Sequence, residues 1–143
     1  MDNIEFFKDR LISIGDDALM DAKYIGLTTD DVIEAYKMAD LPLPISLIPS
    51  RRNIGGGFES GWGNGYVKVS SNHSSYGEDY NHFNVMIHGG LTFAEEISDD
   101  FFGSKGYWIG FDTSHHGDDK EKWPKESVLK ETKELLKQIY RLK

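Results

Sequence analysis

Two stretches of the chain decide its fold: Asn84-Val85-Met86-Ile87-His88-Gly89-Gly90-Leu91-Thr92-Phe93 and Tyr107-Trp108-Ile109-Gly110-Phe111-Asp112-Thr113-Ser114-His115-His116-Gly117-Asp118. Each contains the apolar run of a buried strand, and polar residues follow that run. All five histidines of the chain lie between His73 and His116. Because the ends of strands in a rigid scaffold commonly present functional groups, we expect the chemistry of this protein to lie in the segment 66–118.

Three segments have the residue pattern of strands: 66–70, 84–88 and 107–111. In the first, Val67 and Val69 alternate with polar residues, which is typical of a half-buried strand. Gly89 and Gly90 break or bulge the second strand. The acidic segment 94–106 is punctuated by glycine, so we expect a connection there.

Helices are predicted both before and after these strands in the sequence. Near the C-terminus, apolar residues recur at spacings of four and three: Val128, Thr132, Leu135, Ile139 and Leu142. This stripe predicts an amphipathic helix that begins near Pro124 and packs on the sheet. Three helical segments are expected before the sheet: 3–14 closed by Gly15, 17–26, and one from an N-cap at Thr29 to about Asp40. Leu41-Pro42-Leu43-Pro44 cannot continue that helix, and Leu43 to Ser50 is expected to be extended.

These elements predict an α+β fold, with a small, mainly antiparallel sheet packed by the C-terminal helix. A length of 143 residues suits one domain. We divide it into a helical N-terminal region (1–50), a glycine-rich loop (51–65), and the sheet with its C-terminal helix (66–143). We detect no internal repeat.

Composition excludes several classes of function. A net charge of −8 and a pI near 5.0 argue against binding to a nucleic-acid backbone, which needs clustered Lys and Arg. The chain has no cysteine, which excludes disulfides and thiolate metal sites. The acidic start of the chain lacks the pattern of a secretory signal, and no apolar run has the length of a membrane span. We therefore expect a soluble cytoplasmic protein.

The catalytic candidates are His88, His115 and Asp112, at the ends of two predicted strands. An imidazole can act as a general base or general acid near neutral pH. If the two strands are neighbours, Asp112 can approach His88 and fix the tautomer of its ring. Two plainer interpretations stay open: His88 holds the glycine bulge through backbone bonds, and Asp112 closes a turn.

The glycine-rich loop offers an anion site. Six of the fifteen residues in 51–65 are glycine. Glycine N–H groups can line a phosphate, and Arg51 and Arg52 can add charge-assisted hydrogen bonds. The loop matches neither the Walker pattern nor a dinucleotide-binding fingerprint, so a flexible linker is the alternative.

The remaining candidates concern ligands and metals. The residues predicted to bind a ligand are Arg51, Arg52, Tyr66, His73, Tyr76, Thr92 and Trp108. The aromatic residues among them are either core residues or a lining that suits a nucleobase. A divalent metal has candidate ligands in His115 and Asp118, which lie three residues apart. No other cofactor is predicted.

Several blocks together resemble one family. They are Tyr66-Val67-x-Val69, His73-x-x-Tyr76-Gly77-x-Asp79-Tyr80, His88-Gly89-Gly90-Leu91-Thr92-Phe93 and Trp108-Ile109-Gly110-Phe111-Asp112-x-x-His115-x-Gly117-Asp118. With the closing helix, residues 66–142 resemble a family of small bacteriophage and prophage proteins that are generally labelled hypothetical. Members often carry an acid two residues before the histidine of the His-Gly-Gly block. Met86 occupies that position here, so the resemblance assigns no acid to it.

The resemblance implies a phage accessory protein that counters host defence. Our leading hypothesis is a protein that binds, and in one version hydrolyses, a small anionic ligand of nucleotide type. The rival hypothesis is an acidic inhibitor that covers the basic surface of a host defence nuclease. Its surface acids would be Glu95, Glu96, Asp99, Asp100, Asp118, Asp119 and Glu121. A third possibility is an interaction module whose histidines only hold turns together. Oligomeric state stays open.

Overall fold

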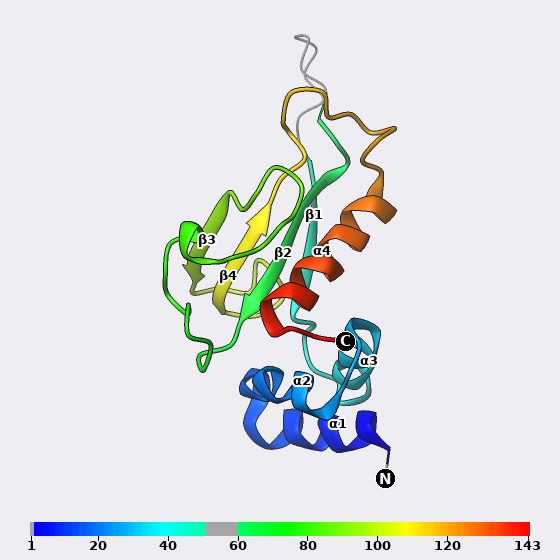
Figure 1. Ribbon diagram of the computed structural model, residues 1–143, viewed down its shortest axis with the longest axis vertical. Coiled ribbons are helices and arrows are strands. Elements are labelled where there is room, and N and C mark those ends of the chain that lie inside the picture. Colours follow the sequence, from blue (N-terminus) through cyan, green and yellow to red (C-terminus); the bar gives the residue numbers. More distant parts are fainter. Residues whose placement is uncertain (1, 51–59) are drawn as a thin grey trace.

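The computed structural model describes residues 2–50 and 60–143 and has an α+β fold (Figure 1). Its helices are α1 (Asn3–Ile14), α2 (Ala22–Ile25), α3 (Thr29–Met38) and α4 (Lys125–Tyr140), with 3-10 turns at Gly15–Asp21 and Tyr80–His82. Its strands are β1 (Ile45–Pro49), β2 (Gly63–Val69), β3 (Phe93–Ile97) and β4 (Gly106–Phe111). Within the described ranges, none of the helices combines the length and the apolar character needed to cross a bilayer.

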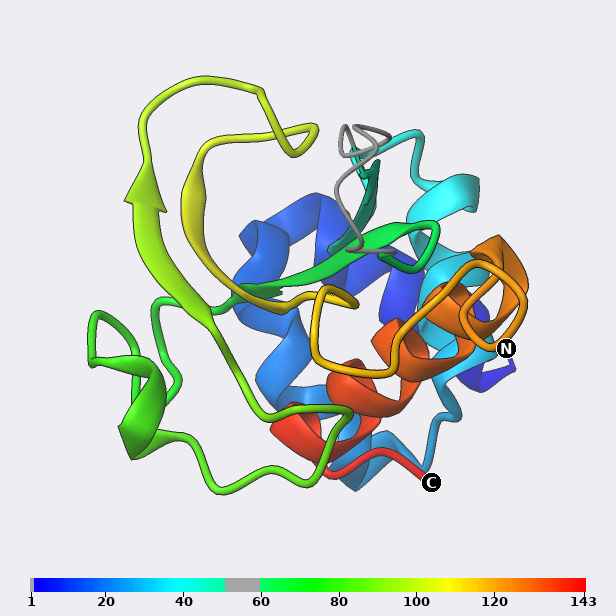
Figure 2. The ribbon, with the colours of Figure 1, turned by 90° about the horizontal axis from the view of Figure 1, so that it is seen from above.

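The four strands form one antiparallel sheet in the order β1-β2-β4-β3. Val67 pairs with Ile109, and these two residues share one face with Val69 and Tyr107 because side chains alternate along a strand. Helix α4 covers this face over β2 and β1 (Figure 2). One buried core therefore joins this face of the sheet, the apolar stripe of α4 and the N-terminal helices.

The opposite face of the sheet is covered by its own aromatic residues. Tyr66 lies edge-on to Phe93, with ring centroids 5.3 Å apart, and its ring centroid lies 4.2 Å from that of Phe102. Phe102 and Trp108 are buried, and the indole Nε1 of Trp108 donates to the carbonyl of Ser104. The connection between β3 and β4 thus folds back and closes this face.

The N-terminal helices pack against each other below the sheet, next to the end of α4 (Figure 1). Two aspartates tie them to the sheet. Asp16 lies 2.7 Å from the ammonium of Lys68 on β2 and also accepts the hydroxyl of Tyr36. Asp17 accepts from the hydroxyl of Ser70, directly after β2. Polar contacts therefore fix the helices at one end of β2.

Most predicted elements are confirmed. The α+β class, the antiparallel pairing, the first helix and the C-terminal helix agree with the sequence analysis. The third predicted helix begins one residue earlier, since Thr28 is the N-cap and forms a capping box with Asp31. The sheet also includes Ile45–Pro49, which lies inside the region that the sequence analysis named helical, although that segment was predicted to be extended.

Two strand predictions are wrong. Residues 84–88 form no strand, and residues 94–97, the start of the predicted connection 94–106, belong to β3. The backbone near Met86 finds its partners on α4 in place of a neighbouring strand: Gln138 accepts from the N–H of Met86 and donates to its carbonyl. Positive φ angles of 68° and 75° at Gly89 and Gly90 then turn the chain toward β3.

Candidate functional site

The candidate site is a cluster of His88, Asp112, His115 and Asp118, called here the histidine cluster. It lies at the end of the sheet opposite the N-terminal helices, where β4 ends at Phe111 (Figure 1). His88 comes from the loop before β3, and the other three residues follow β4 in one tight segment. Residues far apart in the sequence are thus brought together at one end of the sheet.

His88 is paired with Asp118. Its Nε2 lies 2.9 Å from each carboxylate oxygen of Asp118. The side chain of Asp118 is only 6% exposed, whereas that of His88 is 25% exposed. A buried carboxylate therefore orients an imidazole that still reaches the surface, and Nδ1 is the ring nitrogen that Asp118 does not engage.

Asp118 also organises its own loop. It accepts the backbone N–H of His115 at 2.9 Å, and its own N–H donates to the carbonyl of His115. Burial favours the neutral acid, but the hydrogen bonds from His88 and from the backbone of His115 outweigh it. The pKa of the Asp118 carboxyl therefore lies below its usual value of 3.8, and Asp118 is ionised at neutral pH.

His115 is paired with Asp112. Its Nε2 lies 3.0 Å from Asp112 Oδ1. Within the described residues that nitrogen is buried and has no hydrogen-bond partner. The rings of His88 and His115 meet edge to face, with centroids 5.4 Å apart. Two imidazoles, each beside a carboxylate, therefore share one site.

The predicted pairing of His88 with Asp112 is wrong. His88 is not on a strand beside β4, so its ring reaches past the end of β4 to Asp118, 30 residues along the chain. Asp112 accepts the N–H of Ser114 at 3.2 Å in a local turn and faces His115. Asp112 therefore closes a turn, as one of the two interpretations predicted, and it also lies beside the imidazole of His115.

Three residues that the sequence analysis missed hold His88 in place. Glu131 on α4 accepts the backbone N–H of His88 at 3.0 Å, and Gln138 holds Met86 by two hydrogen bonds. The ring of Trp123 lies against the imidazole, with centroids 4.2 Å apart. Glu131 and Gln138 lie seven residues apart, which is about two helical turns. This spacing places two polar side chains on one side of the predicted helix, where they can contact the same segment.

Glycine at position 89 is required by close packing. A Cβ atom there would lie 2.2 Å from His115 Nε2, and φ is 68°. Gly61 is similarly close to Thr113, whose hydroxyl donates to the carbonyl of Gly63 at 2.7 Å. The His115 ring is therefore seated directly on the backbone of the His-Gly-Gly block.

The glycine-rich segment begins and ends near this site. Arg51 and Arg52 lie outside the described residues, as does most of the predicted anion loop. Its described flanks are Ser50 and Ser60, whose hydroxyl oxygens lie 2.9 Å apart. The N–H of Gly61 donates to the carbonyl of Thr113 in the segment that carries His115.

The other predicted ligand residues occupy separate places. Trp108 is fully buried on the far face of the sheet. The Nδ1 of His73 accepts from the N–H of Ser75, and its Nε2 lies 3.2 Å from the carbonyl of Ile139. Tyr76 donates to Glu96, and Thr92 lines a groove along β3. These four are therefore outside the histidine cluster.

Tyr66 differs from these four residues, because the charge of Asp112 in the cluster affects the pKa of its phenol. Burial raises the pKa of its phenol, a hydrogen bond from Asn64 opposes this, and the charge of Asp112 raises it further. Tyr66 lies opposite Gly110 on β4, and Asp112, two residues later, is on the same side of the extended chain. Tyr66 therefore stays neutral at physiological pH at the border of the cluster.

The predicted metal ligands face different partners: Asp118 faces His88, and the ring of His115 faces Asp112. Within the described part of the chain, no three His, Asp or Glu side chains are grouped to hold a metal ion. The chemistry of the cluster is thus that of two imidazole–carboxylate pairs.

No protein-family model, curated protein or solved structure matches the chain. The resemblance to phage proteins therefore stays a prediction from the quoted motifs.

Proposed function

We propose that this protein binds a small anionic ligand of nucleotide type at the histidine cluster and hydrolyses a phosphoester bond in it. The observation that carries the proposal is the pair of imidazoles 5.4 Å apart, each beside its own carboxylate. Two adjacent histidines can supply one proton acceptor and one proton donor for the same reaction. A neighbouring carboxylate can also hold its imidazole in one orientation and one tautomer.

His88 suits the role of general base. Its Nε2–H donates to the buried Asp118, so Nδ1 is the ring nitrogen left to accept a proton. In the proposed step, a water oxygen attacks phosphorus while its proton passes to His88 Nδ1. The bond from phosphorus to the leaving oxygen breaks, and that oxygen takes a proton from the protonated ring of His115. Proton exchange with solvent then restores both rings.

A described lysine supports an anionic ligand, and two arginines that follow Ser50 in the sequence are further candidates. The ammonium of Lys125 lies 5.5 Å from the ring centroid of Trp62. The backbone N–H of Trp62 donates to the carbonyl of Trp123, and the ring of Trp123 lies against the imidazole of His88. Arg51 and Arg52 follow Ser50 in the sequence, and the N–H of Ser50 donates to the carbonyl of Trp62.

The resemblance to phage proteins supplies the biological setting. We place the ligand among the nucleotide signals of host defence, and the protein in the host cytoplasm where such signals act. Removal of the signal, by binding alone or by binding and hydrolysis, would counter the defence.

The test begins with native mass spectrometry of the purified protein, followed by calorimetric titration with mono-, di- and cyclic nucleotides. Phosphorus NMR then monitors each nucleotide for hydrolysis. We expect a bound nucleotide in the wild type and none in the His88→Ala/His115→Ala double variant. His82→Ala is the matched control, since His82 is an exposed histidine outside the cluster.

Normal binding by a folded double variant would refute the proposal. If a nucleotide binds and stays intact, the hydrolytic step is wrong and sequestration stands. Binding at the cluster should change little with salt, whereas an inhibitor that works through exposed acids should weaken steeply as ionic strength rises.

A further inference from the structure

Strand β3 forms an edge of the sheet. Within the described residues it pairs with β4 alone. One row of its backbone N–H and C=O groups therefore faces away from the sheet, ready to pair with another strand. Such edges are often blocked by Lys or Pro, but β3 has the sequence Phe-Ala-Glu-Glu-Ile and carries two acids.

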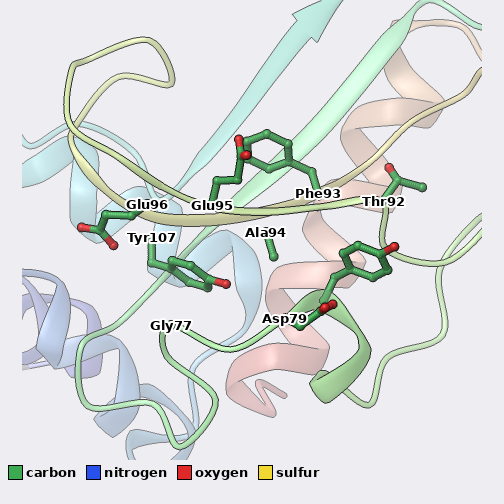
Figure 3. Close-up of a pocket in the computed structure, with 9 residues that line it drawn as sticks. Gly77, Asp79, Thr92, Phe93, Ala94, Glu95, Glu96 and Tyr107 are labelled. Carbon is green, nitrogen blue, oxygen red and sulfur yellow. The ribbon is translucent and has the colours of Figure 1, made fainter.

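A groove of about 690 Å³ runs along β3. Figure 3 shows it between this strand and the segment 77–80, with Ala94 directed into the space and Phe93 and Glu95 directed to the opposite side. The residues that line it are Gly77, Asp79, Tyr80, Thr92, Phe93, Ala94, Glu95, Glu96 and Tyr107. No member of the histidine cluster lines it, so the groove is a second feature of the molecule.

The far wall of the groove is tethered to the sheet. Tyr107 on β4 donates its hydroxyl to the carbonyl of Glu78, and Tyr76 donates to Glu96 on β3 at 3.2 Å. The rings of Tyr76 and Tyr107 lie 5.5 Å apart. These contacts hold the segment at a fixed distance from β3 and leave the small side chain of Ala94 in the space between them.

The groove is strongly negative. Asp79, Glu95 and Glu96 line it, and in the described chain none of them is ion-paired to a lysine or arginine. Burial and the charges of Asp79, Glu78, Glu96 and Glu95 together raise the pKa of Tyr107. A field of this sign attracts ammonium and guanidinium groups, and tyrosine faces add cation–π attraction.

We propose that the edge of β3 and this groove bind an extended basic segment of a partner protein, which adds a strand to the sheet. The unpaired backbone of β3 supplies main-chain hydrogen bonds, as in other cases of strand addition. Alternate side chains of the added strand point toward the groove, where a Lys or Arg side chain meets Tyr80 and the carboxylates of Asp79 and Glu96. This function is independent of the proposed hydrolysis.

A fluorescein-labelled peptide of alternating lysine and valine residues is the probe, measured by fluorescence anisotropy with the full-length protein. Glu95→Lys/Glu96→Lys should weaken its binding by about tenfold or more. Glu5→Lys/Glu34→Lys, on the exposed surfaces of α1 and α3, makes the same change in net charge and should leave binding nearly unchanged. Equal weakening by both variants would mean a response to net charge alone and would overturn the proposal.

Two further measurements test the strand pairing. A probe N-methylated at alternate residues cannot complete the hydrogen-bond ladder, so it should bind far more weakly; equal binding would overturn strand addition. Hydrogen exchange at Phe93–Ile97 should slow when the unmodified peptide binds. Glu96→Gln is the milder variant should the double reversal fail to fold, and it should also weaken binding. Binding of spermine but not of the peptide would overturn a polypeptide occupant.

Discussion

The Nε2 of His88 lies 2.9 Å from both carboxylate oxygens of Asp118, and one of those oxygens also accepts the backbone N–H of His115. A single buried carboxylate thus joins the loop before β3 to the loop after β4. Both imidazoles of the cluster depend on it, one through its ring and one through its backbone.

Asp118→Asn should therefore destabilise the protein and disable the cluster. An asparagine oxygen in the place of Oδ2 can still accept from His88 Nε2 and from the N–H of His115, but an NH₂ group then replaces Oδ1 beside His88, and the negative charge is lost. We expect the free energy of unfolding to fall by about 2 kcal/mol, as for other buried hydrogen bonds to a charged group. Urea unfolding followed by tryptophan fluorescence measures this loss.

Asp112→Asn is the matched control for that substitution. Asp112 is 32% exposed, and an asparagine there keeps the oxygen that accepts from Ser114. The stability loss should be below about 1 kcal/mol. A loss as large as that of Asp118→Asn would show that Asp118 has no special structural role.

Gln138→Ala should loosen the segment that carries His88. It removes both hydrogen bonds to Met86 while it keeps a good helix-forming residue in α4. Amide exchange at residues 86–88 should accelerate by about tenfold, since the lost bonds are worth roughly 1 kcal/mol or more together. Lys137→Ala, at the neighbouring exposed position, should leave that exchange unchanged.

The sequence predicted the fold best where local pattern and packing agree. Val128, Leu135 and Ile139 lie on the buried side of α4, as their spacing required. Alternating valines likewise predicted β2, although the strand begins at Gly63, inside the predicted glycine-rich loop 51–65. For residues 84–88 the same pattern failed, because helix side chains replaced a strand as hydrogen-bond partners. Propensity does not encode which partner satisfies a backbone group.

The sequence predicted which residues form the candidate site, but not which carboxylate lies beside which imidazole. Both histidines and both aspartates of the cluster were among the predicted residues, because polar residues after a buried strand commonly mark a site. Which acid meets which imidazole depends on where the loop before β3 crosses the end of β4, and Gln138 and Glu131 of α4 set that course. The spacing of these two residues places them on one side of α4, but it does not indicate which backbone groups they bind.

His73 should make stability depend on pH. Burial lowers the pKa of its imidazole below the usual value of 6.5; the bond to Ile139 opposes this, and the charge of Arg141 acts with burial. The unfolded chain therefore takes up this proton at a higher pH than the folded chain. The contribution of His73 is complete above the unfolded pKa and is lost as pH falls through 6.5 toward the folded value.

His73→Gln should accordingly flatten the fall in unfolding free energy between about pH 7 and about pH 5. Chemical denaturation at a series of pH values measures the slope. The comparison variant is His82→Gln, because the side chain of His82 is 61% exposed and it should keep the wild-type slope. An unchanged slope in His73→Gln would contradict the prediction.

Gly89 and Gly90 form a natural pair for separating backbone strain from close packing. Both have positive φ, 68° and 75°, but a Cβ at Gly89 would lie 2.2 Å from His115 Nε2, whereas one at Gly90 would meet nothing within 4 Å. Alanine at either position should cost about 1 kcal/mol for the left-handed conformation. Urea unfolding of the two variants measures this shared cost.

Only Gly89→Ala should also displace the ring of His115, because the backbone of a tight turn cannot move aside as a flexible side chain can. That displacement moves His115 away from His88 and Asp112, so nucleotide binding and hydrolysis should be lost in Gly89→Ala and kept in Gly90→Ala. Proton NMR of the histidine ring signals provides an independent readout, with the His115 resonances shifting in the first variant alone. Similar losses of binding in both variants would trace the effect to backbone strain and would remove His115 from the proposed chemistry.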